Sequence, residues 1–139
     1  SVGAAAGIAL RLFGGSVMDE MKPRPLSVAA VTAVVGSVGM ALLGVRAEAV
    51  HVVATLVAFG GGWIWPAFTN FAVVRRNAES AAAATGVTQT GVYVGVFSAP
   101  LVTGALIEWK GYQWMWLVVA AMAVMGAAVT ASLSRHYDR

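Results

Sequence analysis

Long runs without charge dominate this chain. The 21 residues between Arg24 and Arg46 contain no Asp, Glu, Lys or Arg, and three more long uncharged runs follow. Because a helix rises about 1.5 Å per residue, each run can build a helix of roughly 30 Å, the thickness of the hydrocarbon core of a bilayer. Only 11% of the residues are charged and 59% are apolar, whereas soluble domains carry about 25% charged residues. We therefore expect an all-α integral membrane protein.

Short connections between the uncharged runs predict an antiparallel transmembrane helix bundle. Pro25 suits the first turn of a helix, and Ser80 is a favourable N-cap residue. Residues 1–13 are apolar without a basic leader, and we expect them to be the second half of a helix that begins earlier in a longer protein. We treat residues 1–139 as part of one domain. Its expected spans are residues 1–13 (partial), 25–45, 49–74, 80–107 and 112–134.

Lysine and arginine are distributed unequally between the two sides of the predicted bundle. The side richer in these residues faces the cytoplasm in most membrane proteins, so we expect a multi-pass protein of the plasma (inner) membrane with a cytoplasmic C-terminus. The basic residues sit at span ends and form no continuous stripe, which argues against a nucleic-acid partner. Seven lie on one side (Arg11, Lys22, Arg24, Arg75, Arg76, Arg135 and Arg139), and two lie on the other (Arg46 and Lys110).

Aromatic residues gather at the outer end of the last predicted span. Trp and Tyr favour the boundary between lipid and water, where the ring is partly buried and its polar atom stays hydrated. We interpret this cluster as an interfacial anchor. It contains Trp109, Tyr112, Trp114 and Trp116.

Two stretches of the sequence resemble the major facilitator superfamily of transporters. The loop RLFGGSVMDEMKPR at residues 11–24 has Gly15, Asp19 and the basic Arg24 in the order of the family's cytoplasmic loop motif, although Glu20 stands where that motif usually has a basic residue. The stretch ATGVTQTG at residues 84–91, with Pro100 and later glycines, is similar to the family's eleventh helix and the turn that follows it. The resemblance implies a fragment from the end of helix eight through helix twelve, within the C-terminal six-helix half.

The resemblance also implies a cytoplasmic gate. In the family, the loop Asp docks near the N-terminus of the eleventh helix, where free N–H groups carry partial positive charge. The alternative is that Asp19 is a solvated loop acid. The gate residues would be Gly15, Asp19, Arg24, Arg75, Arg76 and Ser80.

The second full span carries three glycines and a proline within residues 60–66, near its middle. Such residues weaken helix geometry, and broken helices are tolerated at this depth where they line a cavity. We therefore expect Trp63, Trp65 and Asn70 to line a substrate cavity. The alternative is that the glycines pack closely on a neighbouring helix and the tryptophans fill space.

The third full span carries polar residues at membrane depth. Gln89 and Tyr93 are spaced i, i+4 and share a helix face, where they are candidates to bind an uncharged polar substrate. Hydrogen bonding between helices explains them equally well. Gly91 and Gly95 form a GxxxG pair, which indicates helix packing.

No predicted full span contains a charged residue. This absence limits the class of solute that the spans can bind. The resemblance implies secondary transport by alternating access, and the missing charges favour a small uncharged or amphipathic solute. Any coupling proton or cation would use the missing half of the protein. We expect no enzyme activity, no cofactor and no metal site, and partners limited to membrane lipid and the substrate. The alternatives are a complete small four-helix exporter and a non-transporting membrane scaffold subunit.

Overall fold

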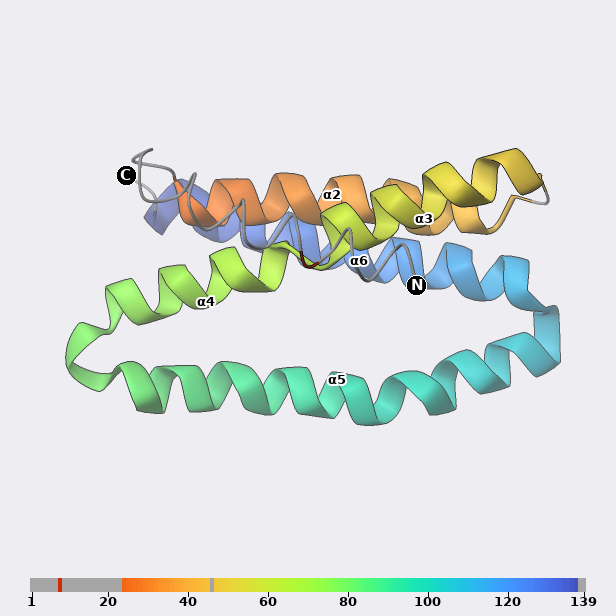
Figure 1. Ribbon diagram of the computed structural model, residues 1–139. Coiled ribbons are helices and arrows are strands. Elements are labelled where there is room, and N and C mark those ends of the chain that lie inside the picture. Colours follow the sequence, from red (N-terminus) through yellow and green to blue (C-terminus); the bar gives the residue numbers. More distant parts are fainter. Residues whose placement is uncertain (1–7, 9–23, 46, 138–139) are drawn as a thin grey trace.

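A computed structural model describes residue 8, residues 24–45 and residues 47–137, and every long element among them is a helix (Figure 1). Four stretches have the length and composition needed to cross a membrane: Pro25–Leu43, Glu48–Arg76, Ala78–Lys110 and Tyr112–Tyr137. The expected all-α architecture with four membrane-length spans is therefore confirmed. The partial span 1–13 lies outside the described residues, apart from Ile8.

The helix boundaries follow the predicted spans closely, with one break. The elements are α2 (Pro25–Leu43), α3 (Glu48–Gly62), α4 (Trp65–Arg76), the short 3₁₀ helix η1 (Ala78–Ser80), α5 (Ala81–Lys110) and α6 (Tyr112–Tyr137). The second span is thus two helices, separated by Trp63 and Ile64, and Pro66 occupies the first turn of α4. Proline is favourable there because the first N–H groups of a helix need no intrahelical acceptor. The weak point predicted at residues 60–66 is a real discontinuity.

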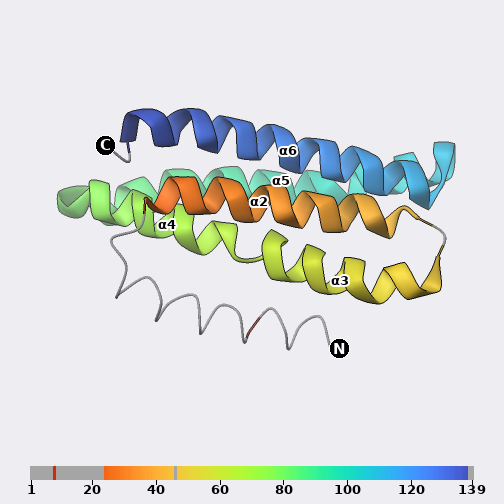
Figure 2. The same ribbon diagram turned by 90° about the horizontal axis from the view of Figure 1, so that it is seen from above.

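α2 lies at the centre of the helix group and contacts α3, α4 and α6 (Figures 1 and 2). Its valines at positions 31, 34, 35 and 38 are exposed, whereas its buried positions are all small. Small residues let helix backbones approach, which in lipid is a main source of helix association. The buried residues of α2 are Ala29, Ala30, Ala33, Gly36, Ser37 and Gly39.

The backbones of α2 and α3 are in direct contact. A Cβ atom added at Gly39 would lie 2.7 Å from the Cα of Ala58, and one added at Gly61 would lie 2.9 Å from the Cα of Gly36. Ordinary Cβ contacts begin near 3.4 Å, so any larger residue at these positions would push the helices apart. Glycine is needed here for close approach.

α5 is the least packed helix of the described chain. None of its residues is buried, and its main contacts are with α4, α6 and η1 (Figure 1). Gly111, with φ of 85°, turns the chain from α5 into α6, a backbone conformation that glycine adopts without strain. α5 therefore presents most of its surface to whatever surrounds the protein.

The two ends of the helix group differ in charge. The start of α2, the α4–α5 connection and the C-terminal end of α6 lie together (Figure 1), and four arginines belong to that end: Arg24, Arg75, Arg76 and Arg135. The opposite end carries Lys110 together with Glu48 and Glu108. Within the described residues, the segregation of basic side chains expected from the sequence is present.

Candidate functional site

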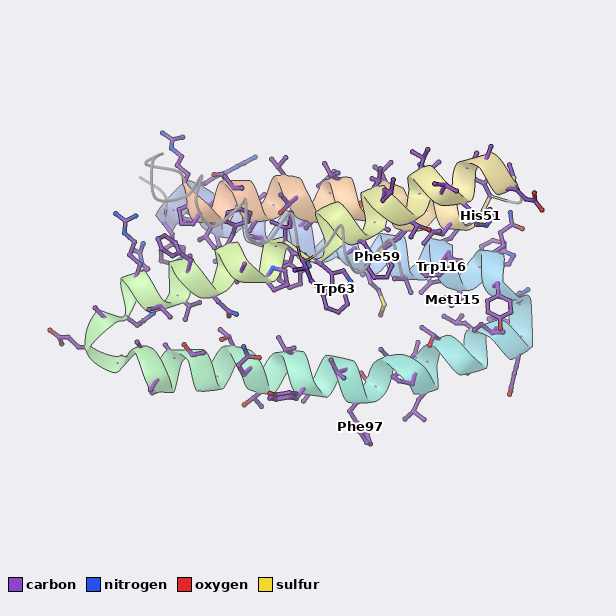
Figure 3. All side chains as sticks on the ribbon, in the orientation of Figure 1. His51, Phe59, Trp63, Phe97, Met115 and Trp116 are labelled. Atoms are coloured by element: carbon purple, nitrogen blue, oxygen red, sulfur yellow. The ribbon has the colours of Figure 1, made fainter. Side chains whose placement is uncertain are left out.

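The helix break places two aromatic rings side by side. Phe59 and Trp63 stack with their ring centroids 6.1 Å apart and their planes 3° apart. Figure 3 shows both rings, Phe59 on α3 and Trp63 in the break, on the side of the span that faces α5. The side chain of Trp63 is 53% exposed, so this ring lies on an accessible surface of the broken span and does not fill the interior.

The glycines of the broken span have a different role from the rings. Gly60 and Gly61 are buried, and Gly61 faces the backbone of α2 at Gly36. The packing interpretation therefore holds for these glycines. Cavity lining stays a prediction for the side chains of the break.

The remaining predicted cavity residue of this span lies on α4. Trp65 and Asn70 are both half-buried, and Asn70 makes no hydrogen bond with any described residue. Its neighbour Thr69 is satisfied locally, because its hydroxyl donates to the carbonyl of Trp65 at 3.0 Å. Inside a membrane, an amide without a partner needs a hydrogen-bonding group from elsewhere.

Gln89 and Tyr93 lie one turn apart on α5. Gln89 is half-buried and Tyr93 is 69% exposed; neither side chain hydrogen-bonds to another described residue. The nearby hydroxyl of Thr90 donates to the carbonyl of Gly86 at 2.9 Å, a pattern that satisfies Ser and Thr within their own helix. The long amide and phenol of α5 therefore differ from its hydroxyls in having no local acceptor.

The predicted cavity residues come from two neighbouring spans. Trp63, Trp65 and Asn70 belong to the α3–α4 span, and Gln89 and Tyr93 belong to α5, which contacts α4 and has no buried residue. Gly91 and Gly95 have open space where a Cβ would be. No helix packs on this pair within the described chain, and its packing role stays a prediction.

Of the predicted gate residues, the structure describes the three arginines and Ser80. Gly15 and Asp19 lie outside the described residues. Arg24 and Arg75 are exposed, and Ser80 is at the N-cap of α5 but makes no side-chain capping hydrogen bond. Arg76 is different: its Nη1 donates to the carbonyl of Tyr137 at 3.0 Å, and its guanidinium carbon lies 4.1 Å from the centroid of the Tyr137 ring.

The contact between Arg76 and Tyr137 links the end of α4 to the end of α6. The carbonyl groups in the last turn of a helix lack intrahelical donors and carry partial negative charge, so an arginine is well suited to them. The ring adds a cation–π contact. Sequence reasoning missed Tyr137, because the two residues are 61 positions apart and only the fold places them together.

The described residues offer no site for a metal ion: no group of three or more His, Cys, Asp or Glu side chains gathers among them. Comparison with known proteins also assigns no chemistry. No protein-family model, curated protein or solved structure matches this chain.

Proposed function

We propose that this chain is part of a secondary active transporter of the major facilitator type, which moves a small uncharged or amphipathic solute by alternating access. The observation that carries the proposal is the state of α5. None of the residues of this membrane-length helix is buried. The helix nevertheless carries Gln89 and Tyr93, whose polar groups have no hydrogen-bond partner among the described residues.

The energetics of lipid support this interpretation. An amide or phenol exposed to hydrocarbon without a hydrogen bond is costly, so polar residues at this depth face protein or a water-filled path. A missing half of the protein would supply such a path along α5. The resemblance of residues 84–91 to the family's eleventh helix agrees with this role.

The broken span offers a hinge position. The buried Gly61 holds α3 against the backbone of α2, and α4, which begins after the break, contacts both α2 and α5. Hinge motions use a few residues at the ends of elements to absorb changes in φ and ψ. Trp63 and Ile64, between α3 and α4, occupy such a position.

The absence of charge in the spans supports the proposed class of solute. The charged residues of the described chain lie at the helix ends. An ionic substrate or a proton relay usually requires an ionisable partner at membrane depth. We therefore infer that these helices contact the uncharged part of the solute, and that coupling uses residues elsewhere in the full-length protein.

The test uses cysteine labelling of the full-length protein in membranes. This chain contains no cysteine, so a single introduced thiol can be read without background from its own residues. Gln89→Cys should react with a polar, membrane-impermeant maleimide and be protected by the transported solute. Val87→Cys is the matched control on the same helix: Val87 is 75% exposed and lies about 200° around the helix from Gln89, so it should face lipid and stay unlabelled.

Transport measurements supply the second readout. Gln89→Ala and Tyr93→Phe should each lower kcat/KM for the solute by about 3- to 10-fold, the effect of losing one neutral hydrogen bond. Thr90→Val should change it less than about 2-fold, because the Thr90 hydroxyl is bonded within α5. No labelling of Gln89→Cys under any condition, with transport unaffected in all three variants, would refute the proposed substrate path and favour a helix-packing scaffold.

A further inference from the structure

A cavity lies at the end of the helix group opposite the arginines. It is an open cavity of about 450 Å³, lined by the end of α2, the first turn of α3 and the connection between α5 and α6. Its walls come close at Gly44, where an added Cβ would lie 3.3 Å from the carbonyl oxygen of Gln113. Residues distant in sequence thus form one depression, outside every site discussed above.

The cavity lies at the level that lipid headgroups occupy around membrane-spanning helices. It lies where the membrane-length helices end, beside Lys110 and the aromatic residues Tyr112 and Trp114. Charged and aromatic residues mark the boundary between hydrocarbon and water. The helices that continue away from it expose apolar side chains, including Val102 of α5 and Leu117 of α6, against which acyl chains can lie.

The polar groups of the cavity suit a phosphate. Lys110 supplies a positive charge, with its Nζ 4.6 Å from the centroid of the Trp109 ring. The Nδ1 of His51 lies 2.9 Å from the carbonyl of Ala47. Because a carbonyl only accepts, Nδ1 is the nitrogen that donates in this contact. The amide of Gln113 also lines the cavity and can donate to a phosphate oxygen, whereas the Nε2 of His51 accepts in this tautomer and suits a donor such as an ammonium group.

The charge balance of this end selects among phospholipids. Glu48 and Glu108 lie at the same end as Lys110, and Arg46 belongs to the same side of the predicted bundle, so two acidic and two basic residues balance there. A purely anionic headgroup therefore gains no net attraction from this end. A headgroup that also carries an ammonium group gains a further attraction, because the rings of Tyr112 and Trp114 line the cavity and aromatic faces attract ammonium ions.

We propose that this cavity binds the headgroup of a zwitterionic, ammonium-bearing phospholipid, with the phosphate at Lys110 and the amide of Gln113, and the ammonium at Tyr112, Trp114 and the Nε2 of His51. The proposal depends on the membrane location of the helices and not on transport. A soluble phosphate ester shares this headgroup chemistry, but only the lipid also uses the apolar helix surfaces beside the cavity.

Native mass spectrometry of the full-length protein in detergent tests the proposal. Equal amounts of phosphatidylethanolamine and phosphatidylglycerol are offered, and we expect preferential retention of phosphatidylethanolamine. Lys110→Ala should reduce that retention about tenfold, the effect of losing a charged hydrogen-bonding group. Arg135→Ala removes an exposed basic side chain at the other end and should retain the lipid like the unmodified protein.

Three outcomes would overturn the inference. The first is equal or greater retention of phosphatidylglycerol by the unmodified protein, which needs no variant to fold. The second is a Lys110→Ala protein that keeps its helix content and binds phosphatidylethanolamine as strongly as Arg135→Ala. The third is displacement of the lipid by glycerophosphoethanolamine at equal concentration, which would identify a soluble phosphate ester as the ligand.

Discussion

Two adjacent glycines at the end of α3 provide a test of the contact between α2 and α3. A Cβ at Gly61 would lie 2.9 Å from both the Cα of Gly36 and the carbonyl oxygen of Thr32. A Cβ at Gly62 would instead meet the Cε of Met40, at 3.1 Å, with the Cα of Gly36 at 4.0 Å. Gly61→Ala therefore collides with backbone, whereas Gly62→Ala meets the flexible end of one side chain.

The expected magnitudes follow from this geometry. A Cβ at Gly61 would lie 2.5 Å from the backbone N of Gly36, and ordinary Cβ contacts begin at 3.4 Å, so Gly61→Ala must open the interface at Gly36 by about 0.9 Å. Overpacking of this kind costs about 1–3 kcal/mol, a factor of about 5 to 150 in the folding equilibrium. Gly62→Ala should cost less than about 1 kcal/mol, because a methionine side chain can change rotamer. The two substitutions are matched in chemistry, helix and position.

Reversible unfolding in mixed micelles, followed by helix content, measures both variants. Gly36→Ala should resemble Gly61→Ala. The double variant should lose less than the sum of the two, since one separation of the helices accommodates both methyl groups. Equal stability of the Gly61→Ala and Gly62→Ala proteins, or full additivity of Gly36→Ala with Gly61→Ala, would refute the close backbone contact.

The other predictions concern the end that carries the arginines. Arg76→Ala should broaden the distance distribution between spin labels at Asn77 and Ser134, measured by pulsed EPR, because it removes both contacts to Tyr137. Tyr137→Phe should leave the distribution unchanged, since the backbone carbonyl and the ring both remain; equal broadening in both variants would contradict the assigned contacts. Asp19→Asn should lower transport by the full-length protein more than it lowers surface expression, and normal flux would remove Asp19 from the gate.

The expected consequences of composition were largely confirmed. Uncharged runs predicted the four membrane-length helices, and the concentration of glycine and proline at residues 60–66 predicted the break between α3 and α4. These features are local: they depend on chain length, hydrophobicity and backbone freedom, which are properties of short segments.

The candidate site was less accessible to sequence reasoning. Gln89 and Tyr93 were recognised because an amide and a phenol at membrane depth are unusual, but the sequence left open whether another helix satisfies them. Within the described residues, none does. Tyr137 could not be paired with Arg76, because an aromatic residue near a terminus has no distinctive spacing relative to a distant arginine.

The amino-acid sequence alone determined that the described chain forms membrane-length helices, where these helices begin and end to within about three residues, and which ends are basic. Only the tertiary structure decided that α2 is the central helix, that Gly61 serves packing while Trp63 stays exposed, and that a cavity forms beside Lys110. The physical reason is that the spans are similarly apolar along their length. Hydrophobicity therefore does not choose neighbours among them; close approach at individual glycines and alanines does, and that requires two helices to be placed together.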